Sequence, residues 1–141
     1  MDFNPLLLEN QICFPLYACS REVVKKYKPY LDEIGLTYTQ YIAMMVLWEK
    51  KEVNMKSLGE ALHLDSGTLT PLLKKMEAEG LVARKRSMED ERNLIVSLTE
   101  KGESLREKAI DIPSKIGSCI NIGAEDALTL HRILHTILGN F

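Results

Sequence analysis

The chain changes its hydrophobic period between residues 55 and 98, and this change restricts the possible folds more than any other feature. Residues 55–62 and 67–79 space their apolar side chains three and four positions apart, as amphipathic helices do. A polar break at residues 65–67 separates them. Two short runs rich in Val, Ile and Leu follow, LVARKRS and NLIVSLT, with the polar sequence SMEDERN between them. This order predicts two helices joined by a tight turn and then a β-hairpin.

Helical spacing also dominates the rest of the chain. We expect a long amphipathic helix over residues 6–34, with a break or kink near Pro15, because proline lacks the backbone N–H that a helix interior uses. Further helices are predicted over residues 37–51, 99–112 and 124–138. The fold class that follows is mainly α with a small β-hairpin wing.

Several polar residues stand where they can cap a helix. Thr37 or Thr39 can cap the helix that ends near residue 51, and Asp65 or Ser66 can cap the second helix of the 55–79 pair. The apolar side of the 37–51 helix is expected to be buried, through Tyr41, Met44, Met45, Leu47 and Trp48.

A single domain over residues 1–141 is the expectation from size, because a chain of 16.0 kDa can bury about two-thirds of its unfolded surface. No apolar run approaches the ~18 residues of a membrane helix, and no basic region of a secretory signal stands near the N-terminus. The three cysteines show neither CxxC nor zinc-ligand spacing. We therefore expect a cytoplasmic protein with no membrane partner, no metal and no other cofactor.

Two short helices, a turn and a hairpin make a winged helix-turn-helix, whose second helix can enter a DNA major groove roughly 12 Å wide. Hydroxyl and basic side chains near that helix N-terminus and on the hairpin can contact phosphates or base edges. The predicted DNA-binding residues are Ser66, Thr68, Thr70, Lys74, Lys75, Arg84, Lys85, Arg86, Asp90 and Arg92. Asp90 can orient Arg92 for insertion into a groove, or form an ordinary surface ion pair. From periodicity alone, a solvated helix and a plain surface hairpin are equally good interpretations.

The charge of the chain points the other way at first. A net charge of -2 and a pI near 5.9 lack the basic footprint that is usual for a nucleic-acid binder. Residues 56–86, however, hold six basic and four acidic side chains, a local balance of +2, so the other 110 residues sum to -4. We expect non-specific DNA binding to be weak and sensitive to salt.

Residues 58–102 resemble the core of the MarR family of transcriptional repressors. The most specific matches are DERN at residues 90–93 and LTEKG at residues 98–102, which fit the family's D-x-R-x wing and L-T-x-x-G patterns. The resemblance covers about residues 5–138. It implies an obligate homodimer with dimerisation helices in residues 1–34 and 103–141, and a winged helix-turn-helix in residues 35–102. Two such motifs would read a pseudo-palindromic operator.

Apolar residues of the C-terminal helices fit the implied dimer interface. They are Ile110, Ile116, Ile120, Leu128, Leu130, Leu134, Ile137 and Leu138. Composition alone leaves open whether these side chains cover a second chain or the core of their own chain.

Cys13 is the candidate for chemistry, although a lone cysteine is more often a small packing residue. All five tyrosines lie within residues 17–41, and phenolic hydroxyls can donate hydrogen bonds that stabilise a thiolate. A thiolate attacks peroxides and becomes a sulfenic acid, which condenses with a second thiol to a disulfide. Cys13 is therefore a candidate redox sensor.

The same region resembles the OhrR branch of the family, the organic hydroperoxide sensors, through LENQICF, LYACSRE, YKPYLD and TYTQY. The resemblance implies that Cys13 is the sensor, that Tyr27 and Tyr38 of the partner subunit donate hydrogen bonds to it, and that Tyr17 is a neighbour. Two-cysteine members carry a resolving cysteine in the C-terminal helical region. Cys119 lies there, which favours an intersubunit Cys13–Cys119 disulfide, while capping by a small thiol stays open. Cys19 is interpreted as a packing residue.

The predicted function is that of a redox-sensing repressor, not an enzyme. The reduced dimer binds its operator and releases it when Cys13 is oxidised by an organic hydroperoxide or a related oxidant. Two alternatives remain: a MarR-type repressor released by a small phenolic ligand, and a thiol peroxidase in which Cys13 turns over. His131 and His135 could share a metal, but a surface or interface pair is the favoured interpretation.

Overall fold

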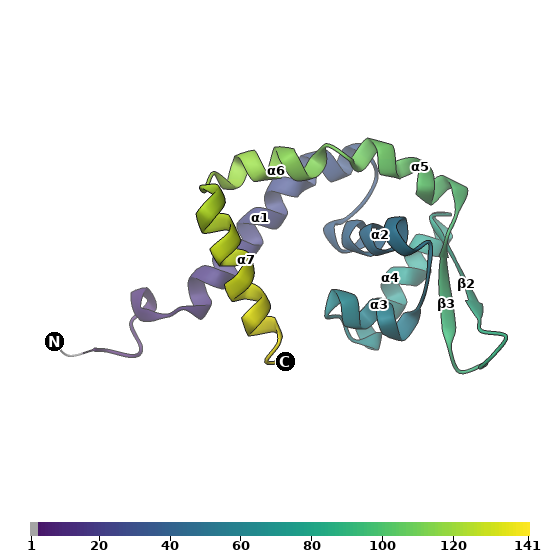
Figure 1. Ribbon diagram of the computed structural model, residues 1–141, viewed down its shortest axis with the longest axis horizontal. Coiled ribbons are helices and arrows are strands. Elements are labelled where there is room, and N and C mark those ends of the chain that lie inside the picture. Colours follow the sequence, from purple (N-terminus) through teal and green to yellow (C-terminus); the bar gives the residue numbers. More distant parts are fainter. Residues whose placement is uncertain (1–2) are drawn as a thin grey trace.

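The computed structural model describes residues 3–141, which form helices and one small sheet (Figure 1). In chain order the elements are the 3₁₀ helix η1 (Leu8–Asn10), α1 (Cys13–Glu33), α2 (Tyr38–Lys50), β1 (Glu52–Asn54), α3 (Met55–Leu62), α4 (Ser66–Ala78), β2 (Val82–Arg86), β3 (Leu94–Leu98), α5 (Glu100–Ala109), α6 (Ile112–Ile120) and α7 (Ala124–Leu138). The predicted mainly helical class with a β-hairpin wing is confirmed.

The N-terminal helix begins later than the sequence predicts. Its first residue is Cys13, and the segment before it holds only η1, so the prediction of a helix from residue 6 is wrong. Pro15 is the third residue of α1, where a backbone N–H would have no partner within the helix in any case. The break expected there is thus the start of the helix. Pro29 lies inside α1 without ending it.

The helix caps follow from local sequence. The Thr37 hydroxyl accepts a hydrogen bond from the Gln40 amide at 3.3 Å, and the Gln40 side chain accepts one from the Thr37 amide at 2.9 Å, which makes a capping box. Asp65 caps α4 by accepting from the Thr68 amide at 2.8 Å. Thr99 caps α5 in the same way. These boundaries match the predictions because capping bonds reach only three residues along the chain.

The sheet holds one more strand than the sequence predicts. Strands β2 and β3 form the predicted antiparallel hairpin, and β1 pairs with the other edge of β3, which gives the order β1–β3–β2. The register of the added pair sets Glu52 opposite Ser97 and Asn54 opposite Ile95. Since β1 is three residues long and its partner is about forty residues away, no local pattern indicates it.

The core lies between α2, α3, α4 and the sheet. Its most buried side chains include Met44, Leu47, Leu58, Leu69, Leu73, Met76, Val82 and Val96. Met45 was expected there, but it is 45% exposed. The indole N–H of Trp48 donates to the Gly102 carbonyl at 3.0 Å, which joins α2 to the start of α5.

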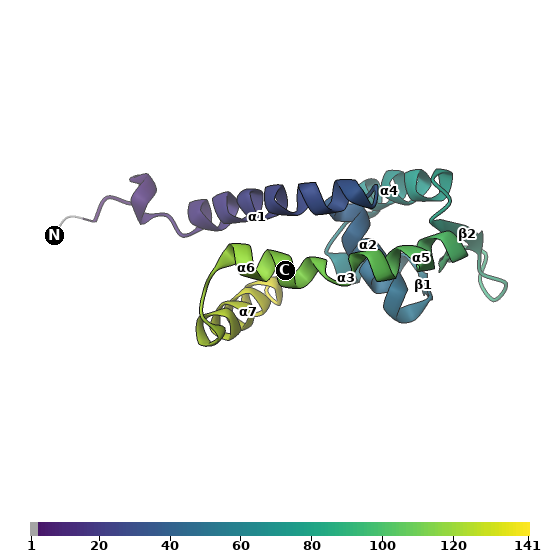
Figure 2. The same cartoon turned by 90° about the horizontal axis from the view of Figure 1, so that it is seen from above.

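The remaining helices are arranged around this core without enclosing it. Helices α1 and α6 run side by side, and α7 folds back from the end of α6 (Figures 1 and 2). Helix α6 was not expected as a separate element. Its Ile112 and Ile116 are buried in the chain's own core, so Ile116 is a core residue, not the interface residue that the sequence suggested. Along the described part of the chain, no helix is both long and apolar enough to cross a membrane.

Candidate DNA-binding and redox-sensing sites

Helix α4 buries one side and exposes the other. Leu69, Leu73 and Met76 are fully buried, so the intervening residues point away from the core. The predicted DNA-binding residues of α4 lie as follows: Ser66, Thr68, Lys74 and Lys75 are exposed, and Thr70 is half-buried. The helix therefore presents two hydroxyls near its N-terminus and a basic pair about two turns further on, as a reading helix requires.

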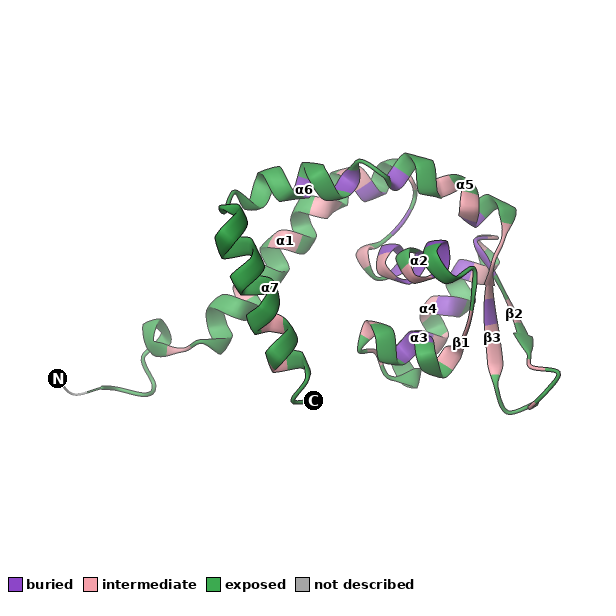
Figure 3. Cartoon of the chain, viewed as in Figure 1, coloured by how far each residue is buried: buried purple, intermediate pink, exposed green. Residues whose placement is uncertain are grey.

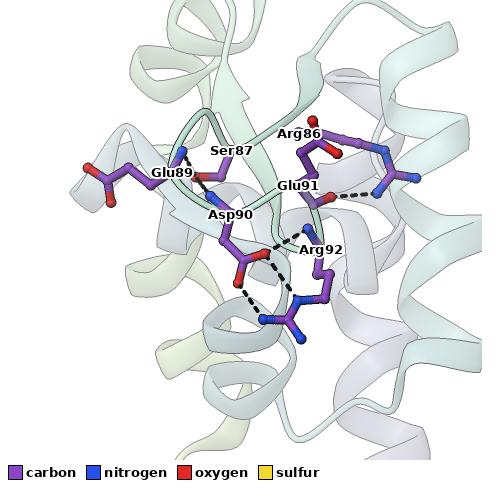
Figure 4. Close-up of polar contacts among 6 residues, drawn as sticks. All are labelled: Arg86, Ser87, Glu89, Asp90, Glu91 and Arg92. Carbon is purple, nitrogen blue, oxygen red and sulfur yellow. Dashed lines mark hydrogen bonds and ion pairs between the residues drawn. The ribbon is translucent and has the colours of Figure 1, made fainter.

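The loop at the tip of the wing holds an ion pair. One carboxylate oxygen of Asp90 accepts hydrogen bonds from the Arg92 backbone N–H at 3.0 Å and from its Nε at 3.2 Å (Figure 4). These bonds, the backbone one first, hold the pKa of Asp90 below its ordinary value. The Arg92 side chain remains 90% exposed. An ionised Asp90 thus holds Arg92 in place while its guanidinium faces solvent.

Two further sets of bonds brace the same loop. Arg86 Nη1 donates to the Glu91 carbonyl at 2.8 Å (Figure 4). The Ser87 hydroxyl accepts from the amides of Glu89 at 3.2 Å and Asp90 at 3.4 Å. Lys85, on β2 just before Arg86, is exposed. The wing tip is therefore an ordered loop and not a loose connection.

Arg84 has a partner that the sequence did not suggest. Its backbone N–H donates to Glu77 Oε2 at 2.8 Å, and its Nε and Nη2 donate to Oε1 at 3.2 and 3.1 Å. The Arg84 side chain is only 19% exposed, and the same bonds, the backbone one first, lower the pKa of Glu77. This bidentate pair joins β2 to the last turns of α4. Seven residues separate the two, and no sequence pattern reveals their contact.

The three cysteines are exposed and unbridged in the single chain. Cys13 is the first residue of α1 and Cys119 lies in the last turn of α6. The Lys115 ammonium stands 5.3 Å from the centre of the Tyr30 ring, which fixes how α6 lies along α1. Tyr30 is about 25 Å along α1 from Cys13 at 1.5 Å per residue. Cys119 is only one turn from Lys115 along α6, so within one chain it stays farther from Cys13 than the ~7 Å between Cα atoms that a disulfide allows. A bridge between these two cysteines therefore needs two chains.

The tyrosines gather at the junction of α1 and α2. The ring centres of Tyr27 and Tyr38 are 4.9 Å apart, and Tyr41 lies 5.6 Å from Tyr27. Burial, reinforced by these two neighbours, raises the pKa of Tyr27 to about 12. The Tyr27 phenol therefore keeps its proton and can donate a hydrogen bond at neutral pH. Tyr41, which was expected on the buried side of α2, belongs to this cluster as well.

This cluster lies far from Cys13 of the same chain. Tyr27 is about 21 Å further along α1, given a rise of 1.5 Å per residue. The structure thus brings Tyr27 and Tyr38 together but leaves Cys13 outside their reach. Tyr17 is exposed one turn beyond Cys13, with the Arg21 guanidinium 5.2 Å from its ring centre.

Comparison with known proteins now decides the family. A family model described as transcriptional regulator SarA/Rot matches residues 25–109. The organic hydroperoxide resistance transcriptional regulator of Bacillus subtilis is 53% identical over 136 residues, which are 96% of this chain and 92% of that protein. The chain belongs to the MarR family of transcriptional regulators. The predicted resemblance is confirmed.

Solved structures of other MarR-type regulators have the same fold. Reduced AbfR bound to DNA superposes with a TM-score of 0.79 at 35% identity, covering 94% of this chain and 93% of that one. Disulfide-formed AbfR superposes less well, with a TM-score of 0.66 at 36% identity over 93% and 92% of the two chains. AbfR is a protein of Staphylococcus epidermidis.

The comparisons also separate the predicted functions. The family and the relatives are regulators of transcription, which confirms a DNA-binding regulator and not an enzyme, and removes support from the thiol peroxidase alternative. A winged helix of the MarR type with oxidation-sensing relatives matches the prediction.

Proposed function

We propose that this protein is a redox-sensing repressor whose reduced homodimer binds a pseudo-palindromic operator and releases it when Cys13 is oxidised. The carrying observation is the exposed polar side of α4 beside a wing whose Arg92 is held outward by Asp90. A helix and an adjacent arginine of this kind suit a major groove and the minor groove next to it. The predicted contacts of Ser66, Thr68 and the α4 lysines belong to this proposal.

Surface area supports the homodimer. The single chain exposes 10375 Å², whereas a folded monomer of 16.0 kDa should expose about 7,400 Å². Large apolar side chains account for part of the excess, with Leu6 90% and Leu128 74% exposed. A second copy that covers residues 1–34 and 103–141 would remove this surface from water. Residues 35–102 of each chain would then carry one reading helix, and the two helices of the dimer would lie about 34–36 Å apart.

Dimerisation would also complete the sensor. Within one chain Cys13 cannot reach the Tyr27–Tyr38 pair, so a contact of Cys13 with Tyr27 or Tyr38 would have to involve the tyrosines of the other subunit. Protonated phenols donate hydrogen bonds that stabilise a thiolate. Tyr17, one turn from Cys13 on the same helix, would be its neighbour within the chain.

The chemistry is a two-electron oxidation. The Cys13 thiolate attacks the outer oxygen of an organic hydroperoxide, the O–O bond breaks, and the products are a Cys13 sulfenic acid and an alkoxide, which takes a proton from water to become the alcohol. The thiol of Cys119 from the other subunit then attacks the sulfenic sulfur, which forms the disulfide and releases water. Such a bridge would displace the N-terminal end of α1 and change the spacing of the wings. In line with this, the fold fits reduced, DNA-bound AbfR better than disulfide-formed AbfR.

The decisive experiment is an operator gel shift with cumene hydroperoxide, comparing the parent with Cys13→Ser. We expect the parent to release DNA and Cys13→Ser to keep it bound, because the serine hydroxyl cannot form a sulfenic acid. Cys19→Ser is the matched control on the same helix and should respond like the parent. Release by Cys13→Ser would contradict the proposal and point to a different oxidant-sensing residue.

The resolving step has a separate test. Oxidised parent should run as a linked dimer on a non-reducing gel, and Cys119→Ser should lose that band. If the band persists in Cys119→Ser, another thiol closes the disulfide. If oxidised parent is monomeric on the gel but heavier by the mass of a small thiol, capping replaces the bridge. All of this chemistry requires reduced resting thiols, so we place the protein in the cytoplasm.

A further inference from the structure

Helix α7 carries two histidines one turn apart whose side chains converge. Nε2 of His131 and Nε2 of His135 are 3.1 Å apart, and their ring centres are separated by 4.2 Å. Both residues are exposed. Neither belongs to the reading helix, the wing or the cysteine sites. We propose that this pair is a binding site for a borderline divalent transition metal, with Zn²⁺ as the representative ion.

The separation of the two nitrogens fits a shared metal. With Zn–N bonds of about 2.0–2.1 Å, two imidazoles on one ion have nitrogens roughly 2.9 Å apart at a right angle and roughly 3.4 Å apart at a tetrahedral angle. The observed 3.1 Å lies between these limits. The rings therefore need almost no rearrangement to bind an ion, and little side-chain entropy is lost on binding.

The same distance also permits a hydrogen bond between the rings, with one imidazole as donor and the other as acceptor. That bond uses only one lone pair. A metal ion engages the lone pairs of both Nε2 atoms, and imidazole nitrogen is a preferred ligand of Zn²⁺, Cu²⁺ and Ni²⁺. The hydrogen-bonded pair is thus the metal-free form of the same site.

Within the single chain the site is open on its remaining sides. Over residues 3–141 no third His, Cys, Asp or Glu joins the two rings to make a larger metal-binding group. The other coordination positions would be filled by water. The bound ion should therefore exchange readily and bind more weakly than in a closed four-ligand site.

Zinc titration calorimetry of the full-length protein tests this proposal. The three cysteines should first be replaced by serine, since thiolates also bind Zn²⁺. We expect one Zn²⁺ per chain, and a loss of affinity of at least roughly 10–100-fold in His131→Gln and in His135→Gln, because even the loss of an outer-shell partner of a metal ligand costs that much. His63→Gln is the matched control, because it removes the third histidine of the chain and should bind like the parent.

Thermal unfolding with and without Zn²⁺ guards against a folding defect in the variants. Because an ion that binds only the folded state stabilises it, Zn²⁺ should raise the Tm of the cysteine-free parent and of His63→Gln, but not that of the two α7 variants. Equal zinc affinity in the parent and in the α7 variants would overturn the proposal. So would the absence of any binding to the parent, or a loss in His63→Gln as large as in the α7 variants.

Discussion

The winged part of the molecule and the helices around it bury their apolar side chains very differently. In α2, α3, α4 and the sheet, large residues such as Met44, Leu58 and Val96 are completely enclosed. Helix α7 has no buried residue, and residues 3–12 before α1 are exposed almost throughout (Figure 3). All three leucines of that segment are exposed. The winged part buries its apolar side chains within a single chain. The other part is also rich in apolar side chains, but nothing in the single chain buries them.

This difference indicates which surface of the molecule a second chain would bury. Apolar surface of this extent is unusual for a monomer and marks an interaction site. A reading surface built on a self-contained core keeps its shape while the surrounding helices rearrange. In the proposed function, oxidation of Cys13, in the uncovered part, would therefore change the spacing of two winged motifs without unfolding either.

The largest expected effect comes from the enclosed part. Leu73→Ala removes a fully buried side chain between α4 and the rest of the core, and should lower the free energy of unfolding by about 2–5 kcal/mol. Urea unfolding followed by circular dichroism measures this. A loss below about 1 kcal/mol would mean that the cavity collapses and that this core is softer than its burial suggests.

A matching change in the uncovered part should act on assembly. Leu128→Ala removes a side chain that is 74% exposed in the single chain, so the fold of the chain should persist. If a partner buries Leu128, the dimer dissociation constant should rise roughly 10- to 100-fold, because burying one leucine is worth about 1.5–3 kcal/mol and each 1.4 kcal/mol is about tenfold. Sedimentation over a concentration series measures it. Met88→Ala, which alters a wing residue that is even more exposed, should leave assembly unchanged.

Within the winged part, Arg84 and Lys85 should affect DNA binding in different ways. Lys85 is exposed and, as a phosphate contact, its loss should reduce the slope of log affinity against log salt by about 0.9 for each wing. Arg84→Ala breaks the pair with Glu77, so we expect weaker binding with an unchanged salt slope. Filter binding over a salt series tests both. A reduced slope in Arg84→Ala would identify Arg84 as a phosphate contact, as the sequence suggested.

The smallest expected effect concerns pH. Bonds from Arg84 lower the pKa of Glu77 below its ordinary 4.5, so this carboxylate adds stability above about pH 4.5 and loses it as the pH falls through the lowered value. Glu77→Gln removes that contribution at every pH. The stability difference between parent and variant should therefore shrink on acidification, as urea unfolding at several pH values can show. A stability difference that stays constant with pH would mean that Glu77→Gln acts through packing alone and not through the charge of Glu77.

Much of the winged part could be predicted because its signals are local. The Thr37, Asp65 and Thr99 caps each accept a hydrogen bond from a backbone amide three residues ahead. The hairpin is indicated by a change in the spacing of apolar residues from a period of 3.6 to a period of 2. The exposed residues of α4 follow from the same period. The start of α1 was missed because apolar spacing continues through residues 6–12, where η1 and an extended segment take the place of a helix.

The sequence alone determined the fold class, most of the helix boundaries and, by resemblance, the family. Tertiary structure decided the contacts between residues that no period relates. These are the pairing of β1 with β3, the Glu77–Arg84 bridge, the burial of Ile116, and the separation of Cys13 from the Tyr27–Tyr38 pair in its own chain. The physical reason is that periodicity and capping report interactions within a turn or two. Which surfaces meet depends on how whole elements pack.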